Sequence, residues 1–444
     1  MKLLKRTLLL LLLAIGVVIY LNYSKLNIIS GYAAKNMASS VFVAERAAAS
    51  ITQNDNNVPL IKLAVTEVDN SDMSALSSVY GFMKRKAVYR EGLGAVLVND
   101  DFDPSKETLK PNRNQPQDTI PYPYGQASPK DTVFPEINGN QLNKAMALAF
   151  ENPEIQKTRT VAVLYKGHLI AEKYIDGFTK DTPVLGWSMN KSVLATCYGI
   201  LEHQAKLGMD WPAPIPEWQE DERKEITLNH LLRMQSGLEW EEDYTKISDA
   251  TKMLYLDSDM AQVQKNKKAI AKPTEIWNYS SGTTNLLSGI LRQQFRTYQE
   301  YLDFPYAALI DKIGMYSMVL EADMEGNFIY SSYGWANTRD WARFGQLHLD
   351  RGNWNGEQIF SPEWVSYITE PTEGSEGTYG AHFWINAGGR YPDVPKNLFS
   401  CNGYQGQYVF IIPSKNLVVV RTGLAKEPSF DINGFLSAVV KSVQ

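Results

Sequence analysis

The wide separation of the strand-forming segments is what most constrains how this chain can fold. One strand–turn–strand pattern occupies 160–174, with a Lys-Gly pair at 166–167 as its turn. Further strand patterns lie near the end of the chain, at 398–400, 408–412 and 417–421. β-Branched and aromatic runs bounded by turn residues are typical of strands. Strands are therefore predicted in two groups far apart in the chain.

The intervening chain, from 188 to about 350, is predicted to be mostly helical, because its apolar residues recur at helical spacing. Helices are also predicted at 141–150 and 430–443. The two groups of strands are then each other's nearest partners. We expect an α+β fold over 138–444, in which one antiparallel sheet is built from both groups and a helical region is inserted between them.

The N-terminus combines cations with an apolar run at 8–21. The cations are Lys2, Lys5 and Arg6. A signal peptide and a short membrane anchor both fit this pattern, although the run is shorter than the ~20 residues that a full span prefers. The small residues that could form a cleavage site, Ala33 and Ala34, lie well beyond the run. This favours an uncleaved anchor over 1–23.

Membrane contact through this segment would leave the basic flank in the cytoplasm. The rest would then be exported, anchored in the inner (cytoplasmic) membrane and facing the periplasm or outside, or secreted if the segment is cleaved. Residues 24–137 are interpreted as a leader region. It contains strand-like runs at 41–43, 60–65, 87–89 and 95–98, followed by a Pro-rich stretch. Such a stretch cannot continue a helix, so we expect an extended strap across the surface.

Composition excludes several functions. The net charge of −5 offers no basic excess for nucleic acid, so no such partner is expected. Two cysteines in 444 residues are not a disulfide scaffold. The five histidines form no His-x-x-x-His pair and there is no Cys-x-x-Cys, so no metal site is expected.

A Ser-x-x-Lys pattern opens one predicted helix. Ser188 precedes apolar positions at helical spacing, so it lies near a helix N-terminus, where backbone N–H groups favour negative charge. Lys191 follows one turn later and presents its amine on the same face. A serine hydroxyl needs a neighbouring base to act as a nucleophile, and a lysine in a dry site can supply one.

Two later stretches add groups that suit acyl transfer. Tyr279 precedes a helix predicted to begin at Ser280 or Ser281, and its hydroxyl is a plausible base or acid. The stretch at 399–407 carries glycines inside a strand, which mark a close backbone approach or a bulge. A substrate carbonyl along such an edge would meet backbone N–H groups that stabilise an oxyanion.

These elements, in this order, resemble the superfamily of class C β-lactamases, DD-peptidases and esterases. The stretches 226–238 (Ile-Thr-Leu-Asn-His-Leu-Leu) and 338–347 (Thr-Arg-Asp-Trp-Ala-Arg-Phe-Gly) resemble two further motifs of that superfamily. The resemblance covers roughly 140–444. It implies a five-stranded antiparallel sheet flanked by helices, with a cleft between the sheet and the helical region.

The resemblance also assigns roles to individual residues. Ser188 matches the nucleophile, Lys191 its partner, and Tyr279 the tyrosine of the Tyr-x-Asn element. The oxyanion hole would be formed by the N–H groups of Ser188 and Tyr404.

The chain departs from the family pattern at the positions expected to contact substrate. Ser281 stands where β-lactamases have Asn, and Cys401, Asn402 and Gly403 stand where they have Lys-Thr-Gly. The missing cation argues against an efficient β-lactamase and is more like the family's esterases and 6-aminohexanoate-oligomer hydrolases. Arg421, on the following strand, is an alternative partner for a substrate anion.

The resulting hypothesis is hydrolysis of a small-molecule or short-peptide ester or amide through an acyl-enzyme on Ser188, without metal or organic cofactor. One alternative is a DD-peptidase or weak β-lactamase acting on cell-wall peptides or β-lactams. The other is a non-catalytic acyl-sensing binding protein.

Overall fold

Six strands form the main antiparallel sheet of the computed structural model, in the order β12-β13-β14-β15-β5-β6. The structure describes residues 2–100, 102–103 and 109–443, so the remaining residues of the predicted ranges lie outside the described residues. The strands are β5 (Thr158–Tyr165), β6 (His168–Tyr174), β12 (Trp384–Ile385), β13 (Phe399–Gly403), β14 (Gln407–Ile412) and β15 (Leu417–Gly423).

The two strand groups join where β15 pairs with β5, with Val419 opposite Val163. The prediction of one antiparallel sheet built from both ends of the domain is confirmed. The expectation of five strands is wrong, because β12 adds a sixth at the edge, with its Trp384 opposite Ser400.

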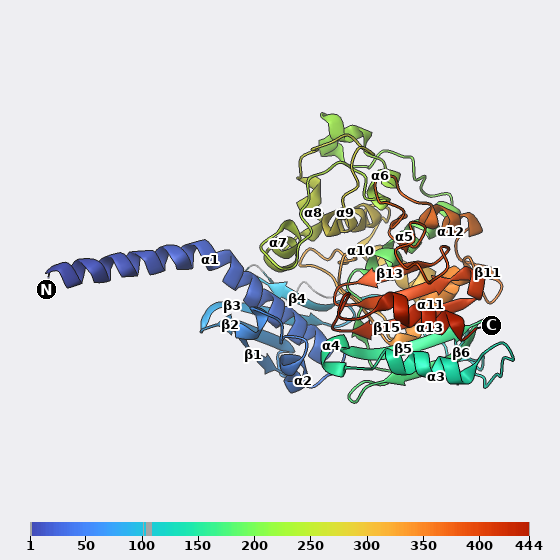
Figure 1. Cartoon of the computed structure of the whole chain (residues 1–444). Helices are drawn as coiled ribbons and strands as arrows, with labels where there is room; N and C mark the ends of the chain where they lie inside the picture. The colour runs from blue at the N-terminus through green and yellow to red at the C-terminus, as the bar shows by residue number, and fades with distance from the viewer. Residues whose placement is uncertain (1, 101, 104–108, 444) are drawn as a thin grey trace.

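Helices cover both faces of this sheet (Figure 1). They are α3 (Gly139–Leu148) and α13 (Ile432–Lys441) on one face, and α5 (Met189–His203) and α11 (Thr338–Leu349) on the other. Successive side chains of a strand point to opposite faces. In β14, Phe410 and Ile412 accordingly pack toward α3 and α13, whereas Val409 and Ile411 pack toward α5 and α11. The sheet is therefore buried between two helical layers.

In the region between β6 and β12 helices outnumber strands, as predicted, and its short strands β7, β8 and β9 form a small sheet. Its elements, with the short helix α4 that precedes the main sheet, are α4 (Pro153–Gln156), β7 (Val184–Leu185), η3 (Pro216–Trp218), η4 (Glu222–Glu225), α6 (Leu228–Leu232), α7 (Asp249–Leu256), α8 (Met260–Lys265), α9 (Ser281–Arg292), α10 (Tyr298–Pro305), η5 (Tyr306–Ile310), β8 (Val319–Leu320), β9 (Gly334–Ala336), β10 (Asn353–Trp354), β11 (Glu357–Gln358) and α12 (Pro362–Thr369).

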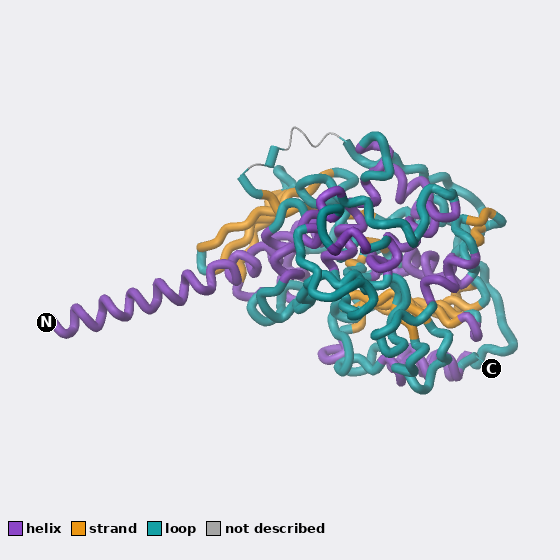
Figure 2. The backbone as a smooth tube through the Cα atoms, turned by 90° about the horizontal axis from the view of Figure 1, so that it is seen from above, coloured by secondary structure: helices purple, strands orange, loops and turns teal. Residues whose placement is uncertain are grey.

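The N-terminal helix α1 (Lys2–Phe42) does not end at residue 23, where the predicted anchor ends. It bends by 48° between Leu4–Tyr20 and Lys25–Phe42. Judged by length and composition, these two segments together pass as a broken membrane span, whereas no single helix in the described residues passes alone. The first segment projects from the body of the molecule and the second packs against it (Figures 1 and 2).

The second segment of α1 lies on a four-stranded antiparallel sheet. Its strands are β1 (Ala64–Asp69), β2 (Ser74–Val79), β3 (Phe82–Arg90) and β4 (Gly94–Val98), with α2 (Ala48–Gln53) and η1 (Ile61–Leu63) beside them. The predicted strand runs at 87–89 and 95–98 are correct, and the run at 60–65 becomes a 3-10 turn leading into β1. The run at 41–43 is wrong, because α1 continues to Phe42 with Ala34 and Ala38 buried against the sheet.

The Pro-rich stretch lies along the helical region, largely without helix or strand, and turns back on itself where Pro121 bridges Ala127. Arg113 donates through Nε to Asp311 Oδ1 at 2.9 Å, and the Tyr122 hydroxyl donates to the Arg339 carbonyl at 2.9 Å. Side chains that alternate with proline therefore attach the strap to the surface.

Candidate active site

Ser188 caps the N-terminus of α5, directly after a constrained turn. Trp187 adopts a left-handed φ of 49°, which is uncommon for a bulky residue and is held here by its packing. A Cβ on Gly186 would lie 2.4 Å from the Trp341 ring, so only glycine fits at that position. The turn thus places a half-buried Ser188 hydroxyl at the positive end of α5.

Lys191 lies one turn further along α5 and is 1% exposed. Its Nζ donates to Ser281 Oγ at 2.8 Å and to the Ser331 carbonyl at 2.9 Å, and it lies 5.1 Å from the centre of the Tyr279 ring. Burial lowers the pKa of Lys191 to about 8, although the nearby Glu242 carboxylate acts in the opposite direction. A neutral amine, which can accept a proton, is therefore accessible near neutral pH.

Tyr279 completes the group of three, since its ring lies 5.1 Å from Lys191 Nζ and the neighbouring Ser188 hydroxyl acts to lower its pKa. Its ring is fixed between Tyr379, at a centroid distance of 5.8 Å, and Trp384, at 5.3 Å. Burial raises the pKa of Tyr279 well above its ordinary value and Glu242 adds to this effect. Tyr279 is therefore a protonated phenol at rest, which suits a proton relay better than the role of a resting base.

Glu242 is the main residue that sequence reasoning missed. Its carboxylate accepts from Ser281 Oγ at 2.5 Å, from Ser281 N at 2.9 Å and from Trp240 Nε1 at 2.6 Å. A chain of hydrogen bonds therefore runs from Lys191 through Ser281 to Glu242. Because Glu242 lies in an acidic run that reads as a solvated loop, no local signal distinguishes it from its neighbours.

The two amides expected to form the oxyanion hole belong to segments that touch. A Cβ on Gly403 would lie 2.1 Å from the Gly186 carbonyl oxygen, so the end of β13 lies against the turn before Ser188. Tyr404 follows directly, and its ring packs 5.3 Å from that of Trp187. Within the described residues, neither the Ser188 N–H nor the Tyr404 N–H donates to a backbone carbonyl in the turns and loops.

Cys401 and Asn402, which were predicted to contact substrate, point to opposite faces of β13. Cys401 is fully buried toward α5, and burial raises the pKa of its thiol to about 12. The structure therefore does not bring Cys401 to the group around Ser188. Asn402 is half-buried, and in the described part of the chain its Oδ1 has no hydrogen-bond partner.

Arg421 does not serve as the alternative cation. It is fully buried and donates to the carbonyl oxygens of Gly406 at 2.7 Å, Ala425 at 2.8 Å and Gln156 at 2.5 Å. These hydrogen bonds tie three chain segments together, so the Arg421 guanidinium is not available to a substrate anion. No group of three or more metal-ligating side chains occurs in residues 2–100, 102–103 and 109–443, and the expected lack of a cofactor stays a prediction.

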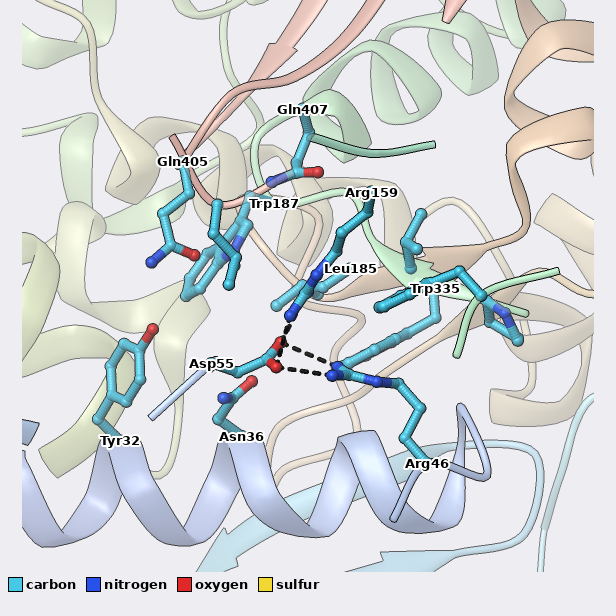
Figure 3. Close-up of a pocket in the computed structure, with 14 residues that line it drawn as sticks. Tyr32, Asn36, Arg46, Asp55, Arg159, Leu185, Trp187, Trp335, Gln405 and Gln407 are labelled. Carbon is cyan, nitrogen blue, oxygen red and sulfur yellow. Dashed lines mark hydrogen bonds and ion pairs between the residues drawn. The ribbon is translucent and has the colours of Figure 1, made fainter. Parts of the chain in front are cut away.

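The leader region docks beside this site (Figure 3). Asp55 accepts from Arg46 and from Arg159 of β5, each through two hydrogen bonds. Burial alone would raise the pKa of Asp55, but the two guanidinium groups hold it at about 2. Tyr32 of α1 stacks against Trp187 at a centroid distance of 6.3 Å. The leader therefore contacts the residue that immediately precedes Ser188.

Comparisons with known proteins agree with this fold. The family described as Beta-lactamase matches residues 155–428. The 6-aminohexanoate-dimer hydrolase of Paenarthrobacter ureafaciens is 24% identical over 320 residues, covering 64% of this chain and 78% of that protein.

Two solved structures share the fold. A candidate 6-aminohexanoate-dimer hydrolase from Bacillus anthracis has a TM-score of 0.57 at 24% identity, covering 66% of this chain and 80% of its own. A penicillin-binding protein homologue from Caulobacter crescentus has a TM-score of 0.54 at 14% identity, covering 71% and 99%. The chain belongs to the β-lactamase family, within the superfamily of serine hydrolases that includes penicillin-binding-protein homologues, esterases and 6-aminohexanoate-dimer hydrolases.

Proposed function

We propose that this protein hydrolyses an ester or amide through a covalent acyl-enzyme on Ser188. The observation that carries the proposal is the buried Lys191, with its lowered pKa, beside Ser188 and Tyr279. A hydroxyl, a phenol and an amine that can be neutral are the parts that nucleophilic catalysis requires.

Acylation follows from these contacts. Ser188 Oγ attacks the substrate carbonyl carbon while its proton passes to the Tyr279 hydroxyl, whose own proton passes to Lys191. The carbonyl oxygen becomes an oxyanion that the N–H groups of Ser188 and Tyr404 stabilise. The C–O or C–N bond then breaks, and the leaving group takes the proton back through Tyr279. Water repeats the sequence on the acyl-enzyme and releases the acid.

Esters and amides are favoured over β-lactams because the stretch at 399–407 contains no lysine or arginine that could face the site. Cys401 is buried and neutral, and the guanidinium of Arg421 is used by three backbone carbonyls and the Thr158 hydroxyl. A penicillin carboxylate would therefore lack a partner there. Asn402 remains as a neutral polar contact for the substrate, whereas Ser281 is fully buried and its hydroxyl joins Lys191 to Glu242.

The test is a fluorophosphonate probe together with turnover of three substrates by the full-length protein in detergent. The substrates are p-nitrophenyl acetate, the linear aminohexanoate dimer and a chromogenic cephalosporin. We expect one adduct on Ser188 and turnover of the ester or amide. The Ser188→Ala variant should lose both, and Ser192→Ala, one turn along the same helix, should keep labelling. Labelling without turnover would indicate an acyl sensor, and release of D-Ala from a cell-wall peptide would indicate a DD-peptidase.

We also propose that the first segment of α1 is an uncleaved membrane anchor, with the hydrolase on the outer side. Its large apolar side chains are exposed throughout, for example Leu10 at 66% and Val18 at 59%. Ala33 and Ala34, the small residues nearest to a cleavage pattern, are buried within the packed part of α1, so cleavage there would remove Ile28 and Ile29 from the core. Intact mass of the protein extracted from membranes tests this, and loss of the first residues would contradict it.

A further inference from the structure

An apolar cavity of about 340 Å³ lies between the leader region and the loops of the active site. Protein interiors leave few voids larger than one water molecule, whereas small-molecule sites occupy about 300–1,000 Å³. A cavity of this size is therefore a candidate binding site and not a packing defect.

The cavity is lined from two sides. The packed segment of α1 contributes Ile28, Ile29 and Tyr32, and the loop entering η1 contributes Leu60 and Ile61. These α1 residues follow helical spacing, so they share one face. The opposite wall consists of residues 244–247 with Thr251, Tyr255 and Tyr404. Most of these side chains are aliphatic or aromatic, which suits a ligand portion without charge.

Two of the lining residues connect the cavity with the reacting groups. The Tyr244 hydroxyl lies 3.4 Å from Ser281 Oγ, the acceptor for Lys191. Tyr404 carries one of the proposed oxyanion N–H groups on its backbone. The two rings stack at a centroid distance of 4.9 Å, and both pack near Trp187. The inner end of the cavity is thus lined by two aromatic residues that also contact the groups around Ser188.

The outer end of the cavity reaches the membrane-proximal part of α1. Lys25, which also lines it, begins the segment that follows the 48° bend. Before the bend, α1 exposes an apolar surface. From Lys25 to Tyr32 the helix advances about 10 Å, so the cavity runs alongside α1 from the bend toward Tyr404.

We infer that this cavity binds the aliphatic acyl chain of the substrate, so that the enzyme prefers medium-chain or longer acyl esters or amides. The inference rests on the proposed acyl-enzyme at Ser188. The walls of the cavity come partly from residues 25–61. These residues precede the part of the chain that matches the β-lactamase family, residues 155–428. The preference would therefore be a property that the leader region adds to the family's reaction centre.

The test measures kcat/KM of the full-length protein for acetyl, butyryl, hexanoyl, octanoyl and decanoyl esters of p-nitrophenol. Because the leaving group is constant, chain length alone varies. Each methylene that enters the cavity should raise kcat/KM roughly fourfold until the cavity is filled. Presenting the octanoyl ester as monomers and in phosphatidylcholine vesicles distinguishes a soluble source from a bilayer source, since only a bilayer source gives faster turnover from vesicles.

Leu60→Asp places a charge in the cavity and should lower kcat/KM for the octanoyl ester at least about tenfold, with the acetyl ester unchanged within about twofold. Leu63→Asp is the matched control, because Leu63 is 37% exposed against 39% for Leu60 and does not line the cavity. Ile247→Trp, which fills the space, should have the same selective effect.

The inference would be overturned if Leu60→Asp lowered kcat/KM equally for the acetyl and octanoyl esters. It would also be overturned if kcat/KM of the native protein did not depend on chain length. If the native protein hydrolyses the acetyl ester in a Ser188-dependent reaction but shows no chain-length effect, only the acyl-chain site fails. If no ester or amide is hydrolysed at any chain length, the proposed function itself fails.

Discussion

Replacing Glu242 with Gln tests the electrostatic argument for Lys191 most directly. Hydrogen bonds of 2.8 Å and 2.5 Å through Ser281 Oγ place Lys191 Nζ and Glu242 Oε1 no more than about 5.3 Å apart. At that distance and an effective dielectric constant of about 20, the attraction is about 3 kcal/mol, which corresponds to about two pH units. Glu242 is only partly buried, so solvent screening reduces this to about one to two pH units.

The sign of the effect follows from the contacts. Burial lowers the pKa of Lys191 and Glu242 raises it, so removing the carboxylate lowers this pKa further. If the neutral amine is the proton acceptor, kcat/KM of the native protein rises with pH and levels off above about 8. In Glu242→Gln the rising limb should move to about pH 6–7, while the plateau falls because one hydrogen bond to Ser281 is lost.

The assay is kcat/KM for a p-nitrophenyl ester from about pH 5 to about pH 10, measured well below KM so that it reports the free enzyme. Glu241→Gln is the matched control, because Glu241 is exposed, pairs with Lys246, and should leave the rising limb in place. A rising limb that stays near pH 8 in Glu242→Gln, or moves upward, would refute the assignment of Lys191 as the titrating base.

Three further predictions concern the fold around the site. Tyr279→Phe removes the relay hydroxyl and should lower kcat about 10²–10⁴-fold, with the melting temperature nearly unchanged; a smaller loss of kcat would exclude the relay. Gly403→Ala brings a Cβ to 2.1 Å from the Gly186 carbonyl oxygen, so kcat should fall through displacement of the oxyanion amide, which an unchanged kcat would contradict. Asp55→Asn leaves two buried guanidinium groups without their carboxylate and should cost about 3–5 kcal/mol in the free energy of unfolding, against little for the exposed Asp181→Asn in the same denaturant titration. Because the pKa of Asp55 is depressed to about 2, its stabilising contribution should persist above pH 4 and disappear only as the pH falls toward 2.

The sequence by itself determined the features that depend on local periodicity. Runs of β-branched and aromatic residues identified β5, β6, β14 and β15, and turn residues between them fixed their antiparallel neighbours. The spacing of Ser188 and Lys191 determined that both lie on one face at the start of α5, because a helix relates such positions whatever surrounds it.

The tertiary structure alone decided which distant groups meet and how dry their surroundings are. Periodicity predicts that a face is buried but not which side chain opposes it, so neither the link from Ser281 to Glu242 nor the burial of Cys401 and Arg421 was visible in sequence. The pKa of Lys191 depends on desolvation, which only packing from several segments provides. The cavity beside α1 likewise exists only because the leader folds back onto the active-site loops, which no local pattern encodes.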